Sequence, residues 1–122
     1  MISILTSIKK MLGIAEDYKH FDSDLIMHIN SVFMVLNQLG VGPKDSFVIV
    51  DENDKWTDFI PEEQPNFEAV KSYMFMKVKL LFDPPLSSAV MESTNRLISE
   101  MEWRLNLNAE SITESEEVDQ NG

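Results

Sequence analysis

The chain has 122 residues, enough for one domain with a single core, and 43% of them are apolar. Its 21 acidic and ten basic side chains give a net charge of −11, which argues against wrapping around nucleic acid because that requires clustered lysine and arginine. No stretch reaches the ~20 unbroken apolar residues of a transmembrane helix, and there is no cysteine to form a disulfide or a thiolate metal site.

The negative charge is concentrated in two segments. Residues 44–68 hold eight acidic side chains and two lysines, a net charge of −6. Residues 109–122 hold five acidic side chains and no basic ones, a net charge of −5, and the rest of the chain sums to zero. This pattern predicts a domain over residues 1–108 that contains an acidic loop, followed by an acidic flexible tail over residues 109–122.

Two helices are expected in the first third of the chain. Residues 2–12 place apolar side chains at helical spacing, and Gly13 follows as a stop signal. A second helix is expected over residues 22–39, with Asp22 as its N-cap and Gly40 after its end. Its main apolar stripe comprises Leu25, Ile29, Val32, Leu36 and Leu39.

The helical pattern is interrupted between Gly40 and Pro65. Residues 40–43 form a turn sequence, and residues 47–50 are a β-prone run that is too short to build a sheet by itself. We therefore expect a small hairpin or an extended arm here, with room for one helical turn over residues 56–60. A segment of this length inside a small domain is usually either functional or disordered.

Two longer helices are expected in the second half. The first begins near Pro65 or Asn66 and ends at Phe82, because two prolines follow Asp83. The second starts at residue 87 or 88 and ends near Leu107, with a predicted apolar stripe of Leu86, Val90, Leu97, Met101 and Leu105. The fold is therefore predicted to be mainly all-α, a small four-helix domain with a short β-prone arm between its second and third helices.

The sequence contains no recognisable catalytic, cofactor-binding or metal-binding motif. His20 and His28 are eight positions apart, whereas a zinc site on one helix face requires a spacing of three or four. The acidic run from Asp51 resembles a calcium loop only in composition, because the cationic Lys55 occupies a ligand position. We therefore expect a protein that is not an enzyme and needs no cofactor or metal.

Four apolar side chains and one lysine are candidates for protein interfaces. Met27 and Met34 lie in line on the second expected helix, seven residues apart and away from its main stripe. Trp103 lies on the far side of the last helix from its stripe, and Trp56 stands beside the acidic loop. Each could instead pack under a loop or the first helix, but together they favour at least one interface. Lys77, inside the apolar face of the third helix, either extends its stem to solvent or pairs with an acid of an adjacent subunit.

Several stretches of the chain resemble small head-tail connector proteins of tailed bacteriophages, some of which carry a label that mentions DNA packaging. They are DSDLIMHINSVF at residues 22–33, LNQLGVGP at 36–43, KVKLLFDPP at 77–85 and EMEWRLN at 100–106. The similarity spans about residues 1–108 and leaves the acidic tail uncovered. Its most specific parts are the segment around the two prolines and the closing helix.

The resemblance implies a structural subunit of the phage neck, located in the virion at the head-tail junction and in the host cytoplasm during assembly. Such subunits form a homo-oligomeric ring, commonly of twelve copies, beneath the portal protein. The ring extends the DNA channel, through which DNA passes without sequence-specific binding, and meets the next neck or tail-completion protein. The family has no catalytic residues to transfer to this chain.

A second function remains open from the residues alone. The acidic loop and tail could belong to a small helical regulator that binds a host or phage protein, and such a surface could mimic DNA. The acids show no regular phosphate-like array, however, which favours the structural subunit. In that case we expect the methionines of the second helix and Trp103 of the fourth to provide two unlike patches, because subunits of a ring meet head to tail.

Overall fold

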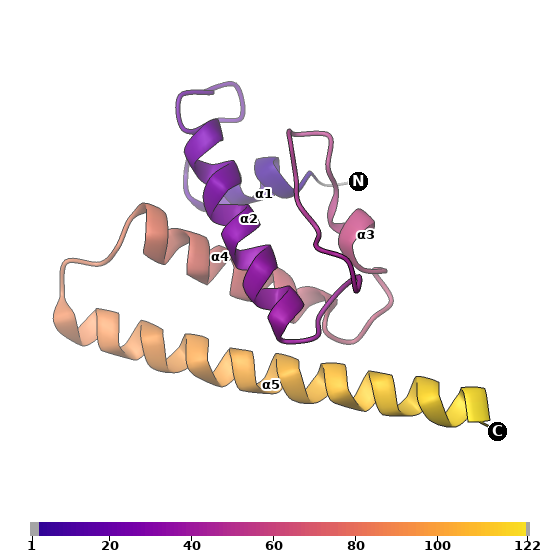
Figure 1. Cartoon of the computed structure of the whole chain (residues 1–122). Coiled ribbons are helices and arrows are strands. Elements are labelled where there is room, and N and C mark those ends of the chain that lie inside the picture. The colour runs from indigo at the N-terminus through magenta and orange to yellow at the C-terminus, as the bar shows by residue number, and fades with distance from the viewer. Residues whose placement is uncertain (1–2, 122) are drawn as a thin grey trace.

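A computed structural model describes the backbone over residues 3–121 and the side chains over residues 3–110. The chain is all-α, as predicted, and the described part forms five helices (Figure 1). In chain order they are α1 (Ile4–Met11), α2 (Asp22–Gln38), α3 (Trp56–Phe59), α4 (Phe67–Phe82) and α5 (Ser88–Asn121). Four of these correspond to the expected main helices, and α3 is the expected single turn.

The segment between α2 and α3 is an extended arm and not a hairpin. Within residues 3–121 the one β-bridge is an isolated antiparallel pair between Ser3 and Lys55, so the arm has no strand partner of its own. Its apolar residues alternate nonetheless: Ile49 is buried, whereas Val48 and Val50 are exposed. This alternation is the period of extended backbone, and it explains the β-prone pattern of the sequence.

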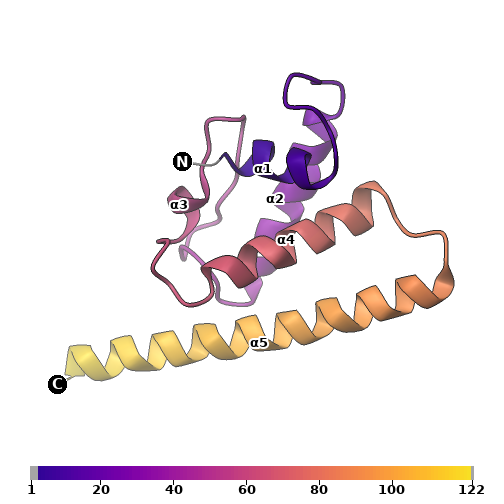
Figure 2. The same cartoon turned by 180° about the vertical axis from the view of Figure 1, so that it is seen from behind.

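The core lies between α2 and α4, with α1 packed against α2 and α5 packed along α4 (Figures 1 and 2). From α2 it receives the predicted stripe, except that Leu39 is only half-buried. The short α3 turn adds two aromatic side chains, and the Phe59 ring lies 4.7 Å from that of Phe33 on α2. Burial of these apolar groups is the main force that holds the helices together.

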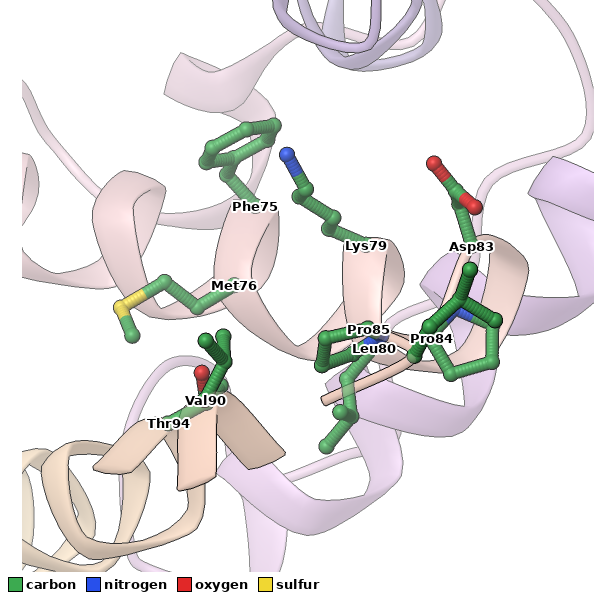
Figure 3. A pocket seen from close by; sticks show the side chains of 10 residues that line it. Phe75, Met76, Lys79, Leu80, Asp83, Pro84, Pro85, Val90 and Thr94 are labelled. Atoms are coloured by element: carbon green, nitrogen blue, oxygen red, sulfur yellow. The ribbon is translucent and has the colours of Figure 1, made fainter. Parts of the chain in front are cut away.

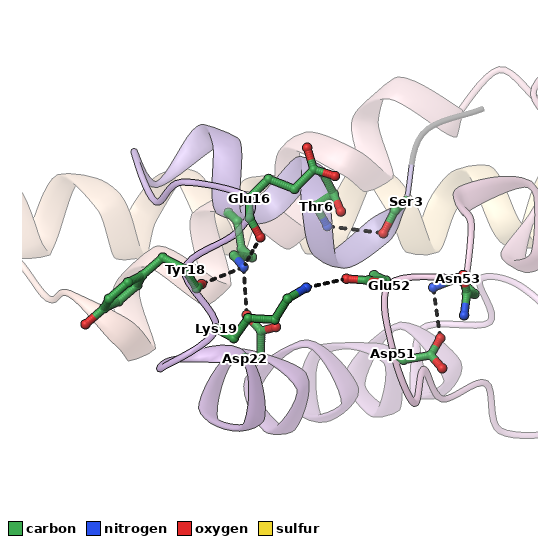
Figure 4. A network of polar contacts seen from close by, with 10 residues as sticks. Ser3, Thr6, Glu16, Tyr18, Lys19, Asp22, Asp51, Glu52 and Asn53 are labelled. Carbon is green, nitrogen blue, oxygen red and sulfur yellow. Dashed lines mark hydrogen bonds and ion pairs between the residues drawn. The ribbon is translucent and has the colours of Figure 1, made fainter.

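A buried lysine fixes the start of α2. Lys9 of α1 is 2% exposed, and its ammonium donates to the backbone carbonyls of Glu16 at 2.9 Å and Tyr18 at 2.7 Å. The same ammonium pairs with the Asp22 carboxylate at 2.8 Å, and Figure 4 shows these partners. The prediction that Asp22 is the N-cap is wrong, because Phe21 holds that position and the carboxylate turns towards Lys9 instead.

Polar contacts attach α5 to the rest of the body. The Asn106 amide donates to the carbonyl of Leu39 at 3.1 Å, which satisfies one of the free carbonyls at the end of α2. The Tyr73 hydroxyl of α4 donates to the Glu102 carboxylate of α5 at 2.5 Å. Burial of the phenol, followed by its hydrogen bond with Glu102, raises the pKa of Tyr73 far above its usual range.

Helix α5 continues beyond the end expected near Leu107. No glycine or proline lies between Ser88 and Asn121, so no residue type in this stretch stops a helix. Ala109 is buried in the core, which places it with the body and not with a tail. The acidic residues from 111 onward lie outside the described side chains, and the division into a domain and a flexible tail stays a prediction.

Candidate protein interfaces

Two exposed methionines mark the outer side of α2. Met27 and Met34 are 61% and 59% exposed, as their spacing predicted. The helix turns its buried residues towards α4, and a seven-residue step brings both methionines to one line on the opposite side. Two such large apolar side chains in line on a helix indicate a contact surface more strongly than a single one would.

The extended arm enlarges this surface. The Asn30 side chain of α2 donates to the Ile49 carbonyl at 3.0 Å and accepts from the Ile49 N–H at 2.8 Å, as a neighbouring strand would. Asn30 lies on the turn of α2 between the two methionines, so this pairing brings the exposed Val48 and Val50 alongside them. We call Met27, Met34, Val48 and Val50 together the methionine face.

A second exposed apolar site lies on α5. Trp103 is 63% exposed, and Leu107, one turn later, is also exposed. The side of α5 that meets the body carries Ile98, Leu105 and Ala109, so the indole points away from the core. Arg104 pairs with Glu100 at 2.7 Å beside it, and both side chains are more than half exposed. Trp103 is therefore exposed, and its place in an interface stays a prediction.

The apolar stripe predicted for α5 is partly wrong. Leu105 is buried and Met101 half-buried as expected, but Val90 and Leu97 are about half exposed and Leu86 is fully exposed. Helix α5 is rotated by about one residue from the expected orientation, which buries Ile98 in place of Leu97. Apolar residues at both positions made the sequence pattern compatible with either rotation.

This rotation leaves a groove of about 450 Å³ where the chain turns from α4 into α5. Figure 3 shows Met76 of α4 facing Val90 and Thr94 of α5 across it. Lys79 and Asp83 line one edge. We call it the α4–α5 groove, and its apolar lining comprises Phe75, Met76, Leu80, Pro85, Leu86 and Val90. The sequence pattern did not reveal this groove, because Leu86 and Val90 were expected in the buried stripe.

The remaining two candidates differ from expectation in different ways. Trp56 is only 3% exposed, and its indole N–H donates to the Ser7 hydroxyl of α1 at 2.9 Å. Trp56 therefore follows the alternative left open by the sequence, because the α3 turn packs it against α1 and the ring of Phe33. A role in an interface stays a prediction. Lys77 is half-buried on α4, and no acidic side chain among residues 3–110 forms an ion pair with it.

Hydrogen bonds from backbone N–H groups to its own aspartate side chains stabilise the acidic loop. The Asp54 carboxylate accepts from the N–H groups of Val50 at 2.7 Å and Asp51 at 3.2 Å. Figure 4 shows the Asp51 carboxylate accepting from the Asn53 N–H, at 2.8 Å. These are the local bonds that short acidic side chains make in turns. Among the described residues, no three histidine, aspartate or glutamate side chains gather closely enough to hold a metal ion. No helix in that part of the chain is long and apolar enough to cross a membrane.

A protein-family model described as phage connector protein matches residues 4–111 of the chain, from the first residue of α1 into α5. The chain belongs to this family. The match covers every helix that contributes to the core, so the resemblance seen in the sequence is confirmed. No curated protein and no solved structure matches the chain. Membership gives the connector a structural role in the neck of a phage particle.

Proposed function

We propose that this connector is a structural subunit that forms a homo-oligomeric ring beneath the portal, extends the DNA channel and joins the head to the tail. Twelve copies on the portal and contact with the next neck or tail-completion protein belong to the same proposal, and DNA passes through the channel without sequence-specific binding. The observation that carries it is the family match over residues 4–111. The match favours this function over the acidic regulator.

The exposed apolar residues support an assembly role. A closed ring needs two unlike patches on each subunit, because neighbouring copies meet head to tail. The methionine face of α2 and the outer side of α5 with Trp103 are separate exposed apolar sites on different helices. Both contain residue types that suit interface cores, since methionine adapts its shape and tryptophan buries a large area. Lys77 is a further proposed contact, because this half-buried residue forms no ion pair with an acidic side chain among residues 3–110.

Ring formation is expected to depend on the portal. Docking on a multi-subunit platform raises the local concentration of connector subunits and orients neighbouring copies, so contacts that are weak in solution become sufficient. We therefore expect a monomer or small oligomer for the purified protein alone and a complete ring on the portal. Negative-stain microscopy of the connector with and without the portal of the same phage distinguishes these states.

Charged substitutions test the two apolar sites. Met34→Asp and Trp103→Asp alter side chains that are more than half exposed, so the helical circular dichroism spectrum is expected to persist. In infected cells each variant is expected to leave filled heads without tails. Met11→Asp is the matched control, because Met11 is an exposed methionine on α1 outside both sites. Normal yields of tailed particles from both variants would remove these residues from the interface, and absence of the wild-type protein from purified virions would refute the neck assignment.

A further inference from the structure

The α4–α5 groove has no role in the contacts described so far. It lies at the turn between two helices, where Pro84 and Pro85 follow the end of α4. The next residue, Leu86, is fully exposed. Among residues 3–110 no element covers this end of the molecule, although half-buried Phe75, Met76 and Leu80 line it. A fully exposed leucine beside an open apolar groove is an expected feature of a surface that another protein covers.

The groove and the methionine face lie on opposite sides of the body. Helix α4 directs its buried Val70, Met74 and Val78 towards the core that it shares with α2, and its groove residues follow on the other side of the helix. Helix α2 in turn presents Met27 and Met34 away from α4. Helix α2 lies in front of α4 in Figure 1, and α4 lies in front of α2 in the view from behind in Figure 2. One subunit can therefore offer both surfaces at once to two different neighbours.

The segments that carry the two surfaces differ in net charge. Residues 13–68, which carry the methionine face, hold twelve acidic and three basic side chains, a net charge of −9. Residues 69–104, which carry the groove, hold five basic and four acidic side chains, a net charge of +1. Asp24 lies one turn before Met27, and Asp51 follows Val50 on the arm, both exposed. Contact between two methionine faces would set acid against acid, which opposes a symmetric dimer through α2.

Contact between unlike surfaces removes this repulsion. Lys79 lines the groove, is exposed, and forms no ion pair among residues 3–110. Asp83 lines the same edge of the groove, so this edge carries one positive and one negative charge, whereas the methionine face has acidic neighbours. The shapes also agree, because flexible methionine side chains that project from a helix can fill a groove with an irregular apolar lining.

We infer that the methionine face of one subunit inserts into the α4–α5 groove of the next. This inference rests on the proposed ring and deepens it, because it names the two surfaces that meet at each subunit boundary. It replaces Trp103 as the partner of the methionines and leaves the outer side of α5 for another component of the neck. The contact is heterologous, so each added subunit exposes the same pair of surfaces and the assembly can close only as a ring or continue as a filament.

Cysteine cross-linking tests the pairing directly, since the chain contains no cysteine of its own. The double variant Met34→Cys with Leu86→Cys is assembled on the portal, treated with a short bismaleimide and separated on a denaturing gel. The expected product is a ladder of covalent oligomers, because each subunit then donates one thiol to each neighbour. Two further double variants serve as comparisons, Met34→Cys with Trp103→Cys and Met11→Cys with Leu86→Cys, and neither is expected to give a ladder.

Other products would overturn the inference. A ladder from Met34→Cys with Trp103→Cys, but none with Leu86→Cys, would place the methionines against the outer side of α5. Covalent dimers from the single variant Met34→Cys would show a symmetric contact between α2 helices. Rings on the portal without the expected ladder would refute the inference and leave the proposed function standing, whereas absence of rings would refute both.

A substitution gives an independent readout. Leu86→Asp changes a fully exposed side chain outside the helices and is not expected to alter the melting temperature. It is expected to lower the fraction of portals that carry a ring by about tenfold or more, the effect of losing one anchor of an interface. The Met11→Asp variant is the control and keeps the wild-type fraction. Wild-type occupancy with Leu86→Asp would count against the groove as the receiving surface.

Discussion

The ammonium of Lys9 lies 2.8 Å from the carboxylate of Asp22, and only 3% of the lysine side chain is exposed. This pair joins the last turn of α1 to the first turn of α2, while two loop carbonyls complete the coordination of the ammonium. It therefore orients α2, and with it the methionine face. A largely buried ion pair of this kind contributes little net stability, but removing the lysine leaves the partly buried Asp22 carboxylate without this partner.

Replacing this lysine is expected to be costly. Lys9→Met keeps the length and apolar stem of the side chain but leaves the Asp22 carboxylate and two carbonyls without their donor. We expect the free energy of unfolding to fall by about 3 kcal/mol, measured by urea denaturation. Lys19→Met is the control, because Lys19 pairs with Glu52 at 2.8 Å on the surface and its loss should change stability little. Equal effects of the two variants would contradict the structural role of Lys9.

The hydrogen bond between Tyr73 and Glu102 predicts a dependence of stability on pH. The pKa of Tyr73 is raised in the folded state, so the neutral phenol is favoured there, and its stabilising effect is complete below the unfolded pKa of about 10. As the pH rises above that value, the unfolded chain loses the proton first and the stability falls. Tyr73→Phe should cost about 1–2 kcal/mol at neutral pH, and this difference should shrink above pH 10. A difference that stays constant with pH, in denaturation curves of both proteins, would contradict the assignment.

Gly42 allows the chain to turn from α2 into the arm. Its φ is +88°, and a Cβ at this position would overlap the ring of Phe59. Gly42→Ala should therefore combine backbone strain with displacement of a core aromatic and lower the free energy of unfolding by about 2–3 kcal/mol. Gly13→Ala is the matched control, because Gly13 also has a positive φ of +79° but open space around it. We expect about 1 kcal/mol for the control, and a similar loss at both sites would show that Phe59 moves without cost.

The acidic tail is expected to be dispensable for folding from residue 111 onward, and not from residue 109 as the sequence suggested. Residues 111–122 hold four acidic side chains, and only Ile112 and Val118 could offset the cost of ordering this segment, ~1–2 kcal/mol per residue. After their removal, the melting temperature should therefore stay close to that of the full chain. Removing residues 109–122 should lower it, because Ala109 is buried in the core next to Gly40. A large drop after the shorter deletion would show that the tail packs on the body.

The amino-acid sequence by itself determined where the helices are, apart from the end of α5. The helix boundaries that were predicted follow local signals such as Gly13, Gly40 and the prolines after Asp83. Helix α2 has its large apolar residues mainly on one side, so the sequence pattern predicted its buried face. The exposure of Met27 and Met34 follows from the same periodicity. These features depend on neighbours within a few residues, and no distant contact was needed to fix them.

The tertiary structure alone decided which face of α5 is buried and which polar groups enter the core. Helix α5 carries apolar residues at Val90 and Leu97 and again one position later at Met91 and Ile98, so only packing against α4 selects between them. Lys9 becomes buried because a loop seven to nine residues later in the chain and Asp22 at the start of α2 supply its acceptors. Whether a charged group or one side of a helix is buried depends on the residues that pack against it. Those residues come together only when the helices pack, so the local sequence does not decide the outcome.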